Sequence, residues 1–336
     1  MSALLVTDER FLSHEAGSRH PEQPARLSAV WEGLAAADLG DALVRVEPRP
    51  AEVEELLVVH PSSHLSRLEM IDAAGGGRVD PDTVMGPDSW EAARLAAGAG
   101  LVAIDALKKG VADFAFCAVR PPGHHAMPER SMGFCLLNNV AVAAAALANA
   151  GQKVVIVDLD AHHGNGTQDA FYGDDRVLFV SCHQWPLYPG TGAADEVGTG
   201  AGIGTTVNLP VPPGTAGDDY RYAMDSLVVP VVENFKPDWL LISAGFDAHR
   251  ADPLTDLGLT SGDYADLMGS LANLVSTGRV IAFLEGGYDL AALSDSVGAS
   301  VAALLGVDHR PEAASGTAGP EARRVIDQLI RQCGVA

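Results

Sequence analysis

One stretch of the sequence runs from an apolar strand directly into acids and histidines. In VVIVDLDAHHGNG, residues 154–166, four β-favouring residues precede the polar cluster. Asp160 and His162 are separated by one residue, so both side chains can point the same way, and Asp247 follows a second apolar run. Two carboxylates and one imidazole make a three-ligand site for a divalent metal with one open position, which is the arrangement that catalytic zinc requires.

The charge of this ligand set indicates that the metal needs help from protein bases. Two aspartates cancel the formal charge of Zn²⁺, so the ion polarises water less than one held by three neutral histidines. His124 and His125, which follow the stiff turn RPPG, can supply those bases. Each imidazole needs a partner that fixes its tautomer, and Asp158 and Asn165 are the natural partners. Because an Asp raises imidazole basicity and an Asn only orients the ring, the two histidines are expected to be electrostatically unequal.

Tyr288 completes a set of groups suited to amide hydrolysis. It follows Gly286 and Gly287, which allow a close backbone approach, and its hydroxyl can donate to an oxyanion opposite the metal. Each motif alone has an ordinary interpretation, as a solvated strand end, a surface histidine pair or a turn. Their coincidence at the predicted strand ends favours a catalytic site.

The elements that must position these residues are short apolar strands alternating with helices. This alternation indicates an α/β protein with a mainly parallel sheet covered on both faces. Strands are expected at 3–7, 113–119, 153–160, 176–181, 205–210, 238–243 and 280–287, and helices at 23–36, 88–109, 138–150, 218–235, 261–277 and 289–305.

Ligand sites of such sheets lie beyond the carboxyl ends of the strands. Polar residues gather after five of the expected strands, so five strands are expected to deliver chemistry to one rim. The clusters read RPPGHHA, DLDAHHGNG, SCHQWPLYPGTG, AGFDAHRADP and EGGYD.

Composition indicates a large core and a strongly acidic surface. The chain has 336 residues, 47% of them hydrophobic, and a formal net charge of −22. This charge argues against a nucleic-acid partner, because phosphate binding needs a basic face. The negative charge either serves only to keep the protein soluble or attracts a cationic substrate through the electrostatic field of the protein. The sequence contains neither a run of about 18 apolar residues nor a signal-peptide pattern, so we expect a cytoplasmic protein without a membrane partner.

The chain is expected to form one main domain with a C-terminal appendage. Residues 1–309 are assigned to the catalytic domain. Residues 310–336 comprise a linker, RPEAASGTAGP, and a helix from about Glu321 to Gln332 that packs on the same domain. The four cysteines are widely spaced and are expected to be reduced thiols. The sequence leaves open whether the protein forms a homo-oligomer.

These ordered motifs resemble the histone deacetylase superfamily, which includes bacterial histone-deacetylase-like amidohydrolases and acetylpolyamine amidohydrolases. The likeness covers nearly the whole chain, and RPPGHHA, Asn165 and EGGY resemble the class II branch. It implies the arginase/deacetylase fold, a three-layer α/β/α sandwich. The matching motifs are HEAGSRHPEQPARL, RPPGHHA, GFCLLNNVAVAAA, DLDAHHGNGTQ, YPGTG, SAGFDAHRADPL and EGGYD.

The resemblance also implies catalytic roles. Asp160, His162 and Asp247 match zinc ligands, although the same ligands accept Fe²⁺. The role of general base falls to His125, and His124 with Asp158 is its electrostatic partner. Asn165 orients the second imidazole, and Tyr288 polarises the acetyl carbonyl.

Further positions are assigned to the substrate and to a structural cation by the same resemblance. Phe134, with the adjacent Gly133, and Tyr188 match the aromatic pair that clasps a lysine chain, and Tyr188 adds a hydroxyl where Phe is common. Leu254 matches the tunnel rim, Asp82 a residue that holds the substrate backbone, and Arg26 an arginine of an internal acetate pocket. A structural K⁺ is implied near the group Asp158, Asp160, His162, Ser181 and Cys182.

The leading hypothesis is therefore a zinc-dependent hydrolase of non-peptide amide bonds that removes acetyl or other acyl groups. Its substrate is either acetyl-lysine on a peptide or protein, which the apolar Leu254 favours, or a small acetylated polyamine, which the acidic charge favours. A non-catalytic scaffold of the same fold would require a lost ligand, base or tyrosine, and all are present. A dimanganese enzyme of the arginase type needs further bridging carboxylates, and position 164 is glycine.

Overall fold

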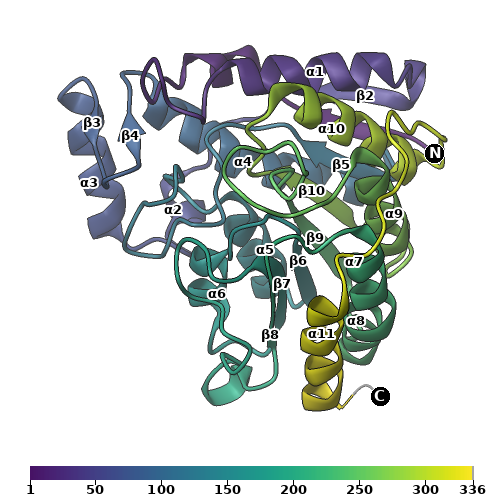
Figure 1. The fold of residues 1–336 in the computed structure, drawn as a ribbon. Coiled ribbons are helices and arrows are strands. Elements are labelled where there is room, and N and C mark those ends of the chain that lie inside the picture. Colours follow the sequence, from purple (N-terminus) through teal and green to yellow (C-terminus); the bar gives the residue numbers. More distant parts are fainter. Residues whose placement is uncertain (335–336) are drawn as a thin grey trace.

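A computed structural model describes residues 1–334 and places an eight-stranded sheet at its centre (Figure 1). Every strand pairing in this sheet is parallel. The inner strands β5, β6, β9 and β10 are buried along their whole length, as expected for near-continuous apolar runs. In spatial order the strands are β2 (Leu43–Val46), β1 (Ala3–Val6), β5 (Phe114–Cys117), β10 (Val280–Leu284), β9 (Trp239–Ala244), β6 (Val154–Asp158), β7 (Val177–Gln184) and β8 (Thr206–Val211).

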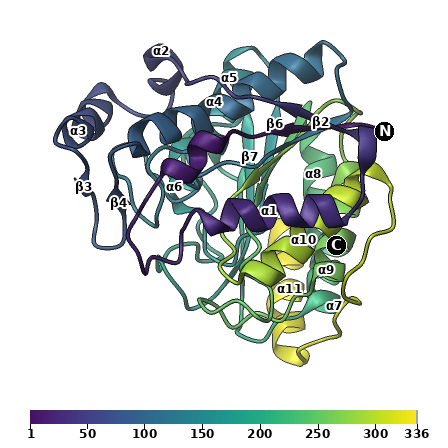
Figure 2. The same cartoon turned by 90° about the horizontal axis from the view of Figure 1, so that it is seen from above.

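Helices cover both faces of the sheet and make three layers, which Figure 2 shows from above. This arrangement confirms the predicted α/β/α architecture. One face carries α2 (Val53–Leu56), α3 (Ser62–Ala73), α4 (Ser89–Lys108), α5 (Asn139–Asn149) and α6 (Asn165–Phe171), and the other carries α1 (Ala25–Ala36), α7 (Gly217–Ala223), α8 (Val229–Phe235), α9 (Ser261–Ala272), α10 (Leu290–Leu305) and α11 (Pro320–Cys333).

Helix ends near the sheet's carboxyl edge follow local capping chemistry. Helix α10 begins after Asp289, whose side chain accepts a hydrogen bond from the Ala292 N–H, and ends at Gly306 in the left-handed conformation. Helix α9 begins with a capping box between Thr260 and Asp263. These caps define where the loops after β9 and β10 stop, and those loops carry candidate site residues.

The structure adds elements that the apolar pattern does not reveal. Strand β2 pairs with β1 but is only partly buried, so its sequence lacks a continuous apolar run. Hydrophobic periodicity also fails to predict the short helices α2 and α6. It likewise does not predict a small antiparallel hairpin, formed by β3 (Gly77–Arg78) and β4 (Val84–Met85). The expected helix at 218–235 is divided by a π-turn at Met224–Val228. Short or half-exposed elements give too little patterning to be predicted.

The C-terminal segment packs onto the main body. Ile326 and Leu329 of α11 are buried in the same apolar cluster as the central sheet. Thr317 and Arg323 both bond to the buried Asp219 of α7. Positions 335 and 336 of the expected appendage lie outside the described residues. Within residues 1–334, every helix is too short or too polar to span a membrane.

Candidate metal and catalytic site

Five neighbouring strands bring the candidate residues to one edge of the sheet. Strands β5, β10, β9, β6 and β7 lie side by side and all run in the same direction. The loop after β5 carries the histidine pair, the loops after β6 and β9 carry the candidate ligands, and the loop after β10 carries Tyr288. The strand order therefore assembles groups that are up to 164 residues apart in the sequence, as between His124 and Tyr288.

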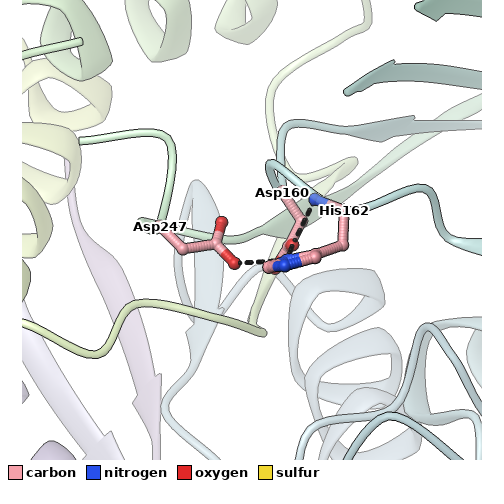
Figure 3. A group of neighbouring side chains, drawn as sticks. All are labelled: Asp160, His162 and Asp247. Carbon is pink, nitrogen blue, oxygen red and sulfur yellow. Dashed lines mark hydrogen bonds and ion pairs between the residues drawn. The ribbon is translucent and has the colours of Figure 1, made fainter. Parts of the chain in front are cut away.

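Asp160, His162 and Asp247 form a buried cluster whose ligand atoms lie within 4.8 Å of one another (Figure 3). His162 Nδ1 lies 2.9 Å from Asp247 Oδ2 and 3.2 Å from Asp160 Oδ1. The backbone holds the carboxylates in place, because the Ala161 N–H donates to Asp247 and the Gly286 N–H donates to Asp160. Three converging donors leave room for a further ligand from substrate or water.

The electrostatics of this cluster fit a divalent cation. Burial opposes protonation of His162, but Asp247 and Asp160 outweigh it and raise the His162 pKa to about 10. Burial and the neighbouring Asp160 raise the pKa of Asp247 to about 7. The site thus holds more negative charge than its buried surroundings stabilise, and a divalent ion neutralises two carboxylates. A side chain at Gly286 would collide with the carboxylates of Asp247 and Asp160, so this position requires glycine.

His124 and His125 lie beside the metal cluster and have unlike partners. His124 Nδ1 lies 3.0 Å from Asp158 Oδ2, and its Nε2 lies 3.7 Å from Asp160 Oδ2. Burial disfavours the charged ring, yet Asp160 and Asp158 together raise the pKa of His124 well above its usual range. His125 Nδ1 lies 2.8 Å from the Asn165 side-chain oxygen. Burial and the charge of His124 lower the pKa of His125 well below its usual range.

Tyr288 lies with its ring against Arg26. The guanidinium of Arg26 stands 4.9 Å from the Tyr288 ring centroid, and its Nε donates to the Gly287 carbonyl at 2.7 Å. Burial raises the Tyr288 pKa well above its usual value, so the hydroxyl remains a donor at neutral pH. Arg26 is itself fully buried and also pairs with Glu22. Its predicted contact with acetate stays a prediction.

The predicted substrate-binding residues surround the same place. The Phe134 ring meets Tyr288 edge to face at 5.8 Å, and the Tyr188 ring meets His125 edge to face at 5.2 Å. Gly133 has a positive φ of 57°, and a side chain there would collide with the ring of His125. Asp82 accepts the Gly133 N–H at 3.0 Å, which ties its loop to the aromatic residues.

Leu254 and the remaining predicted monovalent-cation residues, Ser181 and Cys182, lie on the loop after β9 and on β7. Leu254 is 36% exposed in the loop after Asp247, and its rim role stays a prediction. Ser181 is the register partner of Asp158 on the adjacent strand, and its hydroxyl bonds to His183 Nδ1 at 2.9 Å. Cys182 is buried, which raises its pKa to about 12 and keeps it a thiol.

Several supporting residues were not predicted from the sequence. Glu285 accepts the N–H groups of Gly123 and His124, so it fixes the backbone of the histidine pair. Asp252 accepts the N–H of Tyr288. His20 stacks edge to face on Phe134 at 4.5 Å. The signal for Glu285 and Asp252 was a carboxylate inside each polar strand-end cluster, but neither motif indicates its partner.

The fold and the site define an α/β/α protein with a candidate metal site beside two histidines, and the comparison with protein families identifies its family. Residues 20–304 match the family described as the histone deacetylase domain. The chain belongs to the histone deacetylase family.

Individual relatives agree with this assignment. The chain is 43% identical over 311 residues to a probable deacetylase of Archaeoglobus fulgidus, covering 90% of this chain and 86% of the relative. It is 38% identical to a histone deacetylase-like amidohydrolase of Pseudomonas aeruginosa, covering 81% of this chain and 73% of the relative. The crystal structure of the HDA15 HD domain superposes with a TM-score of 0.91 at 38% identity, covering 99% of this chain and 94% of that one.

Proposed function

We propose that this protein is a zinc-dependent amidohydrolase that removes acetyl groups from acetyl-lysine side chains. The observation that carries the proposal is the buried Asp160, His162 and Asp247 cluster, which lies beside two histidines with unlike partners. Its relatives are named deacetylase and amidohydrolase, which agrees with this chemistry. We further assign catalysis to residues 1–309 and treat the remainder as a packed tail.

The metal would be held by one carboxylate oxygen from each of Asp160 and Asp247 and by Nδ1 of His162. When bound, it supplies Lewis-acid polarisation of the acetyl carbonyl and of the attacking water. Zinc suits this small set of nitrogen and oxygen donors with an open position, and Fe²⁺ is its competitor.

The two histidines divide the proton chemistry between them. His125 Nδ1 donates to Asn165, which leaves its Nε2 free, and its lowered pKa keeps the ring neutral and able to accept a proton. It takes the proton of the attacking water and passes it to the leaving amine. His124 donates to Asp158 and stays charged, so it stabilises negative charge that develops nearby.

Tyr288 and the aromatic side chains position the acyl group. The protonated Tyr288 hydroxyl donates to the carbonyl oxygen as that oxygen gains charge. Phe134 and Tyr188 flank the methylene chain of the lysine, each held by its edge-to-face contact with Tyr288 or His125. Leu254 contacts the substrate at the rim, Asp82 binds the substrate backbone, and Arg26 lines a pocket for acetate.

A structural K⁺ is proposed between the carboxyl end of β6 and the adjacent part of β7. Asp158 and Ser181 are register partners there, and the Asp160 N–H donates to Asp158 at 3.1 Å. Cys182 is buried in β7, and Asp160 and His162 are buried in the segment that follows β6. Carbonyl and carboxylate oxygens of these residues are hard donors suited to such an ion.

A second candidate substrate is a small acetylated polyamine. Carboxylates adjoin the aromatic residues, since Asp82 bonds to Gly133 and Asp80 lies two residues before Asp82. Together with the net charge of −22, they attract a cationic chain. Against this, Asp80 is paired with Arg130, and the exposed Leu254 offers no carboxylate.

The test measures kcat/KM of the zinc-loaded protein on an acetyl-lysine peptide and on mono-acetylated diamines in parallel. Tyr288→Phe is expected to lose about 100-fold or more in kcat, the scale of one oxyanion donor. Tyr222→Phe is the matched control, because the Tyr222 hydroxyl bonds to Asp327 on the surface. Preference for the peptide supports the proposal, preference for the diamines supports the second candidate, and full activity of Tyr288→Phe overturns the mechanism.

A further inference from the structure

The side chain of Asp252 joins the loops that follow strands β9 and β10. One carboxylate oxygen, Oδ2, accepts the Tyr288 N–H at 2.7 Å. The other oxygen, Oδ1, accepts the Leu254 N–H at 3.0 Å. Asp252 is 6% exposed, so these bonds form in a nearly dry environment where they are strong and geometrically demanding. A single side chain therefore sets the position of one loop relative to the other.

The loop that carries Tyr288 has little stiffness of its own. Two glycines precede Tyr288, and Gly287 adopts a positive φ of 121°. Residues without a Cβ offer the chain many alternative conformations, so the direction of the following side chain must be determined by outside contacts. Arg26 bonds to the carbonyl of Gly287, on one side of Tyr288. Asp252 bonds to the N–H of Tyr288 itself.

The loop of Asp252 also begins at the metal cluster. Asp247 lies five residues earlier in the same loop, and the Thr255 hydroxyl bonds to the Asp247 carbonyl at 2.5 Å. The bond from Asp252 to Tyr288 consequently ties the position of the tyrosine hydroxyl to that of a candidate metal ligand. A hydroxyl that donates to a reacting carbonyl must be placed relative to the metal within a fraction of an ångström.

We propose that Asp252 is a positioning residue that holds the Tyr288 hydroxyl in register with the metal cluster. This inference rests on the proposed amidohydrolase function. The positioning role requires both carboxylate oxygens of Asp252. A local turn would need only the hydrogen bond from the Leu254 N–H, which the side-chain oxygen of an asparagine can also accept. The Oδ2 atom also accepts the Asp289 N–H at 3.4 Å, so an Asn at position 252 places its NH₂ group against the backbone N–H groups at one of the two oxygen positions and removes at least one bond.

The experiment compares Asp252→Asn, Tyr288→Phe and the double variant on an acetyl-lysine peptide, with zinc content and melting temperature measured for each. Asp252→Asn is expected to lower kcat by about 10-fold with little change in KM, because the reacting geometry is disturbed and the rim is not. The double variant is expected to match Tyr288→Phe within about threefold, since Asp252 acts through the same hydroxyl. Asp219→Asn is the matched control, a buried carboxylate of α7 that bonds to Thr317 and Arg323.

The remaining outcomes distinguish the positioning role of Asp252 from the proposed amidohydrolase function. A double variant that loses the product of the two single losses, or an Asp252→Asn effect confined to KM, overturns the positioning role and leaves the proposed function intact. A loss explained by lower zinc content, or an equal loss of kcat in Asp219→Asn, also overturns it. If Tyr288→Phe itself keeps full activity, the proposed function fails first, and the coupling to Tyr288 fails with it.

Discussion

The rings of His124 and His125 lie 4.0 Å apart between centroids, yet one is held by a carboxylate and the other by an amide. The carboxylate of Asp158 favours a charged His124, and the charge of His124 in turn lowers the pKa of His125. Two adjacent residues of the same type are therefore given opposite protonation states by their partners.

Exchanging the partners of these histidines should change the pH profile in a defined direction. In Asn165→Asp a new carboxylate favours the charged form of His125 and raises its pKa. Because the base must be neutral, the acidic limb of the kcat/KM profile should move to higher pH and activity at pH 7 should fall by about 10- to 100-fold. Asp158→Asn should lower kcat by a similar factor, because His124 loses the carboxylate that favours its charged form. An unchanged profile for Asn165→Asp would show that His125 is not the base.

Removal of the metal should affect stability as well as activity. Chelation should abolish hydrolysis and lower the melting temperature, because the buried carboxylates of Asp160 and Asp247 then lack a counter-charge. Restored zinc at 1,000 times its Kd should stabilise the fold by about 4 kcal/mol. Elemental analysis should find one transition metal per chain. Two metals per chain would instead support the arginase-type alternative. The control for the loss of one negative charge is Asp174→Asn, which removes a carboxylate on the surface beside Arg176.

Gly286 should be intolerant of even a methyl group. Its Cβ would collide with the carboxylates of Asp247 and Asp160, so Gly286→Ala should displace a metal ligand. We expect zinc content and kcat/KM both to fall by at least about 10-fold, the lower range for disturbed metal surroundings. A Cβ at Gly269 in α9 would meet nothing within 4 Å. The control Gly269→Ala should therefore keep full activity, and its free energy of unfolding should rise by about 0.5–1 kcal/mol. Normal zinc binding by Gly286→Ala would contradict the close approach of the loop after β10 to the metal ligands.

His60 should make the fold sensitive to acid. Its Nδ1 donates to the Pro128 carbonyl at 3.0 Å and its Nε2 accepts the Asn138 N–H at 2.9 Å, so the neutral ring satisfies both partners. Burial lowers the His60 pKa from 6.5 to about 4. Between these pH values the unfolded chain binds a proton that the folded chain does not, so stability falls as pH drops from about 6.5 to 4. The full loss in the free energy of unfolding is about 3 kcal/mol.

The variant His60→Gln tests this linkage. Glutamine can donate to Pro128 and accept from Asn138 without titrating. Urea unfolding at pH 8 and pH 4.5 should show a smaller acid loss for the variant than for the natural chain. Equal losses would assign the acid sensitivity elsewhere, for example to the neighbouring His64, whose ring lies 5.1 Å away.

Much of the architecture follows from the sequence pattern. The apolar runs at 113–119, 153–160, 238–243 and 280–287 predicted buried parallel strands, and the structure contains β5, β6, β9 and β10 there with slightly different ends. The clustering of the candidate ligands Asp160, His162 and Asp247 also followed, because polar residues after parallel strands must share one edge. The partners of the histidine pair could be expected as well, since Asp158 and Asn165 flank the ligands in the same segment.

Only the tertiary structure decided the order of the strands and the contacts between loops. Strands β10 and β9 lie between β5 and β6, which brings Tyr288 and Asp247 to His124 and Asp160, and periodicity carries no information on that order. The bond from Asp252 to Tyr288 joins residues 36 positions apart in two irregular loops. Sequence pattern determines which face of an element is buried, because burial is local, whereas a bond between loops depends on how the whole sheet places their ends.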